Sequence, residues 1–143
     1  MMKKILVVDD EPAIRSMLGV VLAADDREFV EATNGTEAQE ILETSVFDLV
    51  ISDVIMPDCD GIELVMAIRR KLPNVPVIIM SGGGRVQASH YLKQATKLGA
   101  AKVFEKPFDT AELRTTVSTL LGEIEPAAAG EQQVDAAGEQ EPA

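Results

Sequence analysis

Short apolar runs rich in Val and Ile alternate along the chain with segments of helical period. This alternation is typical of βαβ units that build a parallel sheet. All but the second run are apolar enough for a strand buried on both faces, so we expect helices on both sides of the sheet. The predicted strands are residues 4–8, 28–32, 48–52, 76–80 and 101–105.

Five helices are predicted between and after these strands, and local signals mark where they begin. Proline is favoured in the first turn of a helix, whereas asparagine and aspartate side chains cap a helix start. The five predicted helices begin after Glu11, Asn34, Asp60, the glycine run 82–84 and Asp109.

The composition changes at residue 123. Residues 123–143 are rich in Ala, Gly, Glu, Gln and Pro, and they hold six of the 24 acidic residues and none of the 13 basic ones. Nothing in this segment builds a core, so we expect one globular domain over residues 1–122 and an acidic, disordered tail over 123–143. The net charge of −11 leaves −5 for residues 1–122, which argues against nucleic-acid binding.

The sequence shows neither a signal-type segment nor an apolar run of membrane-spanning length. Its single cysteine, Cys59, forms no internal disulfide, which fits a reducing compartment. We therefore expect a cytoplasmic protein without a membrane partner.

Polar residues follow four of the predicted strands. Asp9 and Asp10 follow the first, Asp53 the third, Ser81 the fourth and Lys106 the fifth. The carboxyl ends of parallel strands share one edge of a sheet, and open α/β folds bind ligands at that edge. Three carboxylates brought together repel one another unless a cation neutralises them, and Mg²⁺ prefers oxygen ligands. The pattern therefore predicts a magnesium site for phosphate chemistry.

A carboxylate at such a site is also a candidate nucleophile that forms an aspartyl-phosphate. Asp53 is the better candidate because it stands alone at a strand end. Lys106 would supply positive charge to a phosphoryl oxygen, and the Ser81 hydroxyl would supply a hydrogen bond. Each residue taken alone also has a plainer interpretation as a turn former, a helix cap or a loop residue. The ordered set favours a joint site.

Four segments resemble the receiver domain of two-component response regulators. They are Val-Val-Asp-Asp-Glu-Pro at 7–12, the stretch 48–61 that contains Ser-Asp-Val-Ile-Met-Pro, Met-Ser-Gly at 80–82 and Glu-Lys-Pro-Phe at 105–108. The resemblance spans about residues 3–122. It implies a flavodoxin-like, doubly wound α/β fold, with a five-stranded parallel sheet of order 2-1-3-4-5 and five surrounding helices.

The resemblance also implies roles for the site residues. Asp53 corresponds to the phosphoacceptor, which takes a phosphoryl group from a phosphohistidine of a sensor histidine kinase or phosphotransfer protein. Asp10, Asp53 and the backbone carbonyl of Ile55 correspond to ligands of Mg²⁺, and Asp9 to an acid that acts largely through water.

Ser81 corresponds to the switch hydroxyl of the family, and Lys106 to the lysine that pairs with the phosphoryl group. The chain departs from the family pattern at Val103, where the family usually has Tyr or Phe three residues before the lysine. The stretch from Ser81 to Lys106 is also a few residues longer than usual. We therefore expect no aromatic switch of the usual kind at this position.

Three functions are compatible with the sequence. The first is a stand-alone receiver, a signalling protein that acts through contact with an unknown protein partner or through phosphorelay, because no DNA-binding domain or enzyme is recognised after residue 122. The second is an Asp-nucleophile phosphatase, which would have a second Asp where this chain has Ile55. The third is a receiver-like scaffold that acts without phosphorylation. The intact set of acids favours the first.

Overall fold

The computed structural model describes residues 2–53, 61–81, 97, 99–105 and 108–123. Two compact units make up the chain, Met1–Phe108 and Asp109–Ala143. Most of the predicted fourth helix and most of the predicted acidic tail lie outside the described residues. Both therefore stay predictions, as does the domain boundary at residue 122.

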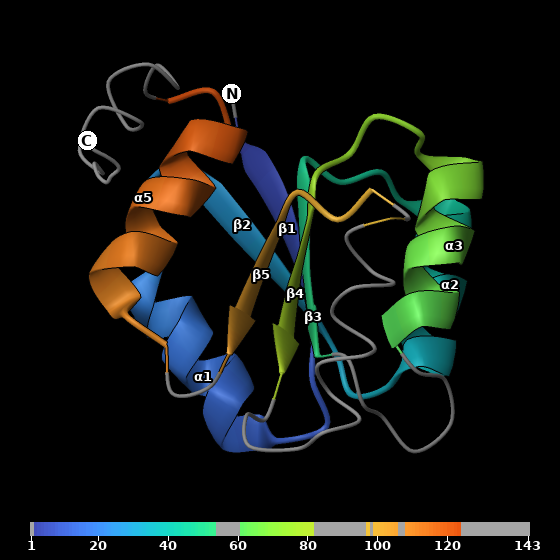
Figure 1. Ribbon diagram of the computed structural model, residues 1–143, viewed down its shortest axis with the longest axis horizontal. Helices are drawn as coiled ribbons and strands as arrows, with labels where there is room; N and C mark the ends of the chain where they lie inside the picture. Colours follow the sequence, from blue (N-terminus) through green and yellow to red (C-terminus); the bar gives the residue numbers. More distant parts are fainter. Residues whose placement is uncertain (1, 54–60, 82–96, 98, 106–107, 124–143) are drawn as a thin grey trace. The chain divides into compact units, whose positions relative to one another are not determined.

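Five parallel strands form one sheet in the order β2-β1-β3-β4-β5 (Figure 1). Each observed strand begins and ends about one residue or less from its predicted bounds, which confirms the strand assignments and the α/β fold with strand order 2-1-3-4-5. The strands are β1 (Lys3–Val8), β2 (Arg27–Ala32), β3 (Leu49–Asp53), β4 (Val77–Ser81) and β5 (Lys102–Glu105).

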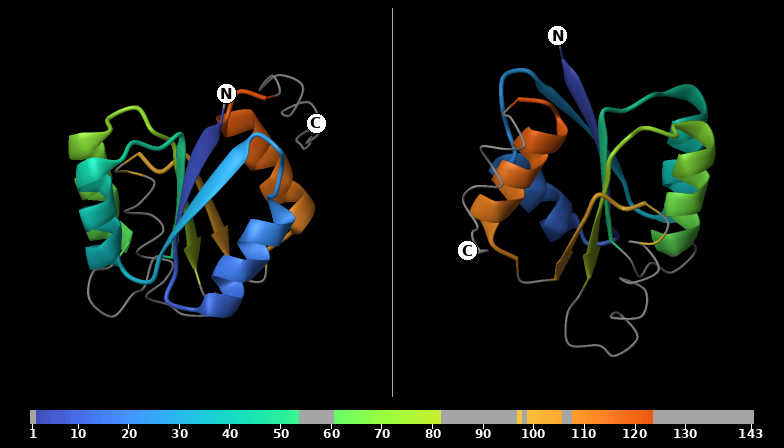
Figure 2. Two further views of the ribbon diagram at one scale, coloured as in Figure 1. Left: turned by 180° about the vertical axis from the view of Figure 1, so that it is seen from behind. Right: turned by 45° about the horizontal axis from the view of Figure 1, so that its top comes forward.

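Helices of the first unit cover both faces of its sheet, as the apolar strands predict. The helix α1 (Pro12–Val21) lies on one face, whereas α2 (Gly35–Thr44) and α3 (Gly61–Lys71) lie side by side on the other (Figures 1 and 2). The second unit contains α5 (Thr110–Leu120). In the described part of the chain, none of the helices combines the length and the apolar character needed to cross a bilayer.

The central strands are the most buried. All five residues of β3 are buried, as is β1 from Ile5 onward, because strands in the middle of a sheet with helices on both faces have no solvent-exposed side. Alternate strand residues pack with the inner faces of α2 and α3. This part of the core includes Leu6, Val8, Val50, Val77 and Ile79 from the strands and Ala38, Leu42, Leu64, Val65 and Ile68 from the helices.

Local capping explains where α2 and α5 begin. The Asn34 side chain accepts a hydrogen bond from the Glu37 N–H at 2.7 Å, and the Asp109 side chain accepts one from the Ala111 N–H at 2.8 Å. These bonds satisfy backbone donors that have no partner inside the helix. Both predicted caps are confirmed, and Pro12 occupies the first turn of α1.

Candidate functional site

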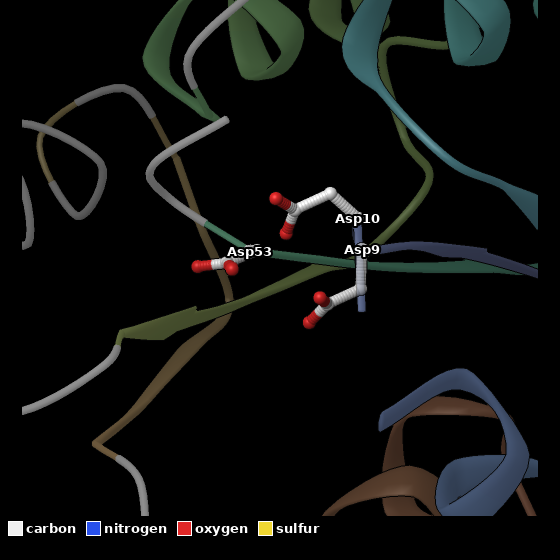
Figure 3. A group of neighbouring side chains, drawn as sticks. All are labelled: Asp9, Asp10 and Asp53. Carbon is white, nitrogen blue, oxygen red and sulfur yellow. The ribbon is translucent and has the colours of Figure 1, made fainter. Parts of the chain in front are cut away.

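Asp9, Asp10 and Asp53 come together at the carboxyl edge of the sheet (Figure 3). Each offers one carboxylate oxygen, and these oxygens lie within 4.8 Å of one another. Asp9 and Asp10 follow β1 directly, and Asp53 is the last residue of β3. Because β1 and β3 are neighbours, with Val8 opposite Ser52, the next residues of both strands lie level with each other. The strand order therefore assembles the cluster from distant parts of the sequence.

Burial differs among the three acids. Asp9 is 0% exposed and Asp53 is 8% exposed, whereas Asp10 is exposed to solvent. The two buried carboxylates require hydrogen bonds or positive charge, and all three carboxylates repel one another at close range. A cluster of carboxylate oxygens that is open to solvent on the side of Asp10 suits a hard divalent cation that keeps some of its bound water. The three residues thus fit the magnesium site that the sequence predicts.

Hydrogen bonds hold Asp9 at its N–H, its side chain and its carbonyl. The Asp9 N–H donates to the Ala32 carbonyl of β2 at 3.1 Å, and Oδ1 of Asp9 accepts from the Glu11 N–H at 2.9 Å. The Asp9 carbonyl accepts from Nη1 of Arg15 at 2.8 Å. Sequence analysis assigned Arg15 no role. The available signal was that Arg15 is the one charged residue within α1.

The Ser52 hydroxyl restrains the backbone carbonyl of Asp53, the third acid of the cluster. Its hydroxyl donates to the Asp53 carbonyl at 2.9 Å, and the side chain is completely buried. Sequence reasoning did not assign Ser52 a role. The available signal was a hydroxyl residue directly after the apolar run Leu49–Ile51, since a buried hydroxyl requires a hydrogen-bond partner.

The register of β4 and β5 positions Ser81 at the same edge. Asp53 lies opposite Met80, so Ser81 lies one position further along β4. Ser81 in turn lies opposite Glu105, the last residue of β5. Ile55 and Lys106 lie outside the described residues, and the roles assigned to them stay predictions.

The strand that precedes Lys106 carries adjacent apolar residues on opposite faces. Val103 packs against the core that contains α2 and α3, whereas Phe104 is buried and contacts Phe108 edge to face, with 6.2 Å between ring centroids. Successive residues of a strand point to opposite faces of the sheet. The Phe104 ring therefore does not occupy the position of the aromatic residue that Val103 replaces.

Comparison with known proteins agrees with this geometry. Residues 5–118 match the response regulator receiver domain family. The chain is 37% identical to the response regulator protein PilR of Pseudomonas aeruginosa, over 83% of the chain and 26% of PilR. It is 36% identical to sporulation initiation phosphotransferase F of Bacillus subtilis, over 85% of the chain and 95% of that protein. The chain thus spans about a quarter of the length of PilR and nearly all of the second relative.

Solved structures give the same result. The response regulator protein TrrA of Thermotoga maritima, in complex with Mg²⁺-BeF, is similar with a TM-score of 0.72 and 35% identity, over 83% of this chain and 99% of that one. The matched region includes the three clustered acids and all of the described strands except Lys3 and Lys4 of β1. The chain belongs to the family of response regulator receiver domains.

Proposed function

We propose that this chain accepts a phosphoryl group on Asp53 in a Mg²⁺-dependent reaction and signals through the phosphorylated state. The observation that carries this proposal is the convergence of Asp9, Asp10 and Asp53, whose carboxylate oxygens lie within 4.8 Å of one another. Receiver domains take phosphoryl groups from histidine kinases or phosphotransfer proteins. The phosphoryl donor of this chain is therefore a phosphohistidine on a protein of one of these two classes.

The acids would hold the cation. Asp10, Asp53 and the carbonyl of Ile55 would bind Mg²⁺, with Asp9 acting largely through water. The bound ion would supply positive charge that offsets both the acid cluster and the oxygens of the incoming phosphoryl group. The Mg²⁺-BeF complex of TrrA supports this assignment.

The reaction requires little covalent chemistry beyond positioning. A carboxylate oxygen of Asp53 attacks the phosphorus and forms an oxygen–phosphorus bond. The bond between phosphorus and the donor imidazole nitrogen breaks, and its electron pair stays on the imidazole. Ser81 and Lys106 then contact oxygens of the phosphoryl group. Water later attacks the phosphorus, which releases inorganic phosphate and restores the carboxylate.

We further propose that the chain works as a single-domain, cytoplasmic regulator, with output through protein contacts or phosphorelay. The similarity to sporulation initiation phosphotransferase F over 95% of that protein supports the phosphorelay part of this proposal, because that relative is itself named as a phosphotransferase. PilR, of which the chain covers 26%, represents regulators with additional parts. A phosphorylated sample that passes its label to a purified phosphotransfer protein would support the relay.

The primary test is the intact mass of the protein after incubation with acetyl phosphate, with and without Mg²⁺. We expect the wild type to gain one phosphoryl group only when Mg²⁺ is present. Asp53→Asn should gain none, because the amide oxygen is a poor nucleophile. Asp25→Asn, which removes an exposed acid outside the cluster, is the matched control and should behave as the wild type.

Three results would contradict the proposal. Stoichiometric labelling of Asp53→Asn would place the phosphoacceptor elsewhere. No labelling of the wild type, either by acetyl phosphate or by a phosphorylated histidine kinase domain, would favour the phosphorylation-independent scaffold. Sustained hydrolysis of small phosphate esters would favour the phosphatase.

A further inference from the structure

We infer that Arg15 is a positioning residue for the metal-binding acids at the end of β1. The inference rests on the proposed function, since it concerns how the chain holds those acids for a cation. The Arg15 guanidinium joins two parts of the first unit. Its Nη1 donates to the Asp9 carbonyl at 2.8 Å, and its Nε donates to Oε1 of Glu31 at 2.9 Å.

The first contact acts on the peptide bond that links the two neighbouring acids. The Asp9 carbonyl belongs to the peptide group between Asp9 and Asp10, and such a group is planar. A hydrogen bond that fixes the carbonyl oxygen therefore also fixes the orientation of the Asp10 N–H. It likewise restricts the position of the Asp10 Cα, which carries the side chain. Asp10 is the exposed member of the cluster, so its geometry depends on this backbone restraint more than on packing.

The second contact gives Arg15 its own support. Glu31 lies in β2 opposite Val7, one residue before Ala32, whose carbonyl accepts the Asp9 N–H. The edge strand β2 thus holds the turn after β1 at two adjacent positions, once directly and once through Arg15. The Arg15 side chain is 13% exposed, so its geometry is more restricted than that of an ordinary surface ion pair.

The role is one of position more than of charge. Arg15 is paired with Glu31 at 2.9 Å, so its positive charge already has an opposite charge outside the acid cluster. The planar guanidinium of Arg15 nevertheless donates hydrogen bonds in two directions, to the Asp9 carbonyl and to Glu31. Lysine lacks this property, because its ammonium is a single point on a flexible stem. Arg15→Lys should therefore restore only part of the function that Arg15→Met removes.

The test is a titration with Mg²⁺ alone, without a phosphoryl donor. The Kd is measured from backbone amide chemical shifts of ¹⁵N-labelled protein, at a temperature where thermal unfolding shows each variant to be folded. We expect Arg15→Met to weaken Mg²⁺ binding by about tenfold, as is typical when a residue that orients metal ligands is lost. Arg15→Lys and Glu31→Gln should give smaller losses, and Arg70→Met, an exposed arginine of α3, should give none.

A second readout separates positioning from stability. Phosphorylation by acetyl phosphate is measured against Mg²⁺ concentration, with the half-saturating concentration and the maximal rate determined separately. We expect Arg15→Met to raise the half-saturating concentration and to leave the maximal rate much closer to that of the wild type. A residue that only stabilises the fold would change neither value in folded protein.

The outcomes distinguish the two proposals. If the wild type binds Mg²⁺ and Asp10→Asn weakens binding, but Arg15→Met stays within about twofold of the wild type, the role of Arg15 is overturned and the proposed function stands. If the wild type shows no saturable Mg²⁺ binding, the proposed function is overturned, and the role of Arg15, which rests on it, is overturned with it. Should Arg15→Met not fold, Arg15→Lys and Glu31→Gln decide the question, and unchanged Mg²⁺ affinity in both would overturn the inference.

Discussion

Asp53 of β3 lies opposite Met80 of β4, which puts Ser81 one position beyond the proposed phosphoacceptor on the neighbouring strand. Ser81 in turn lies opposite Glu105, the residue before Lys106. Asp53 and Ser81 are the last residues of their strands, so a group bonded to the Asp53 carboxylate would lie at the edge of the sheet where β4 also ends. The contact between Ser81 and the phosphorylated acid stays a prediction, which substitution of Ser81 tests.

Ser81→Ala should slow phosphoryl uptake without abolishing it. A hydrogen bond to a charged group contributes about 1.5–3 kcal/mol, so we expect the rate constant with acetyl phosphate to fall by roughly tenfold or more. Ser81→Thr keeps the hydroxyl and should retain most of the rate. The measurement is the time course of intact mass. A wild-type rate in Ser81→Ala would remove Ser81 from the site.

Mg²⁺ should stabilise the protein through the acid cluster. The carboxylates of Asp9, Asp10 and Asp53 repel one another without a cation, so Asp10→Asn should raise the Tm in metal-free buffer of low ionic strength. A saturating ligand at about 100 times its Kd adds about 2.7 kcal/mol to the free energy of unfolding. Mg²⁺ should therefore raise the Tm of the wild type more than that of Asp10→Asn. Equal responses of both proteins to Mg²⁺ would contradict a metal site here.

Glu37 should make stability depend on pH in the acid range. Hydrogen bonds from the Thr33 N–H and hydroxyl, at 2.6 and 2.9 Å, lower the pKa of Glu37 from its usual 4.5, and the charge of Arg15 lowers it further. A lowered folded-state pKa contributes stability that is present above the unfolded-state pKa and is lost as pH falls through the folded value.

Urea unfolding at a series of pH values tests this linkage. Glu37→Gln should lose less stability than the wild type as pH decreases from about 4.5. Glu40→Gln removes a carboxylate of the same helix without affecting the Thr33 bonds and is the control. Parallel curves for Glu37→Gln and the wild type below that pH would contradict the expected linkage.

Arg69 should contribute to stability through backbone carbonyls beyond α3. Its guanidinium donates to the carbonyls of Pro73 and Val75, both at 2.6 Å, and more distantly to that of Gly99 at 3.5 Å. Arg69→Met should lower the free energy of unfolding by about 2–3 kcal/mol, because the bonds involve a charged donor. Arg70→Met, on an exposed neighbour, should change it by about 0.5 kcal/mol or less. Equal stability of the two variants in urea unfolding would show that these carbonyl contacts are not needed.

Features set by neighbouring residues were readable from the sequence. The cap at Asn34 depends on a donor only three residues away, and the strands follow from apolar runs that require burial on both faces. The candidate acids were also readable, since a charged residue that directly follows a buried strand is conspicuous. Lys106 was predicted in the same way, whereas the role of the Ile55 carbonyl followed only from the family resemblance, and both stay predictions.

Contacts between distant segments were not readable. Nothing in the pattern around Arg15 indicates that its guanidinium joins the Asp9 carbonyl to Glu31, because Glu31 becomes a neighbour only when β2 pairs with β1. The contact between Arg69 and Gly99 likewise crosses 30 residues of sequence.

The sequence by itself determined the approximate bounds of the described strands, where the described helices begin, and which polar residues follow the strands. Periodicity and capping act over a few residues and leave a direct trace in the order of side chains. The tertiary structure decided that β1 lies beside β3 and so brought three acids within 4.8 Å of one another. It also decided which side chains support them, because strand pairing and register depend on the packing of the whole sheet.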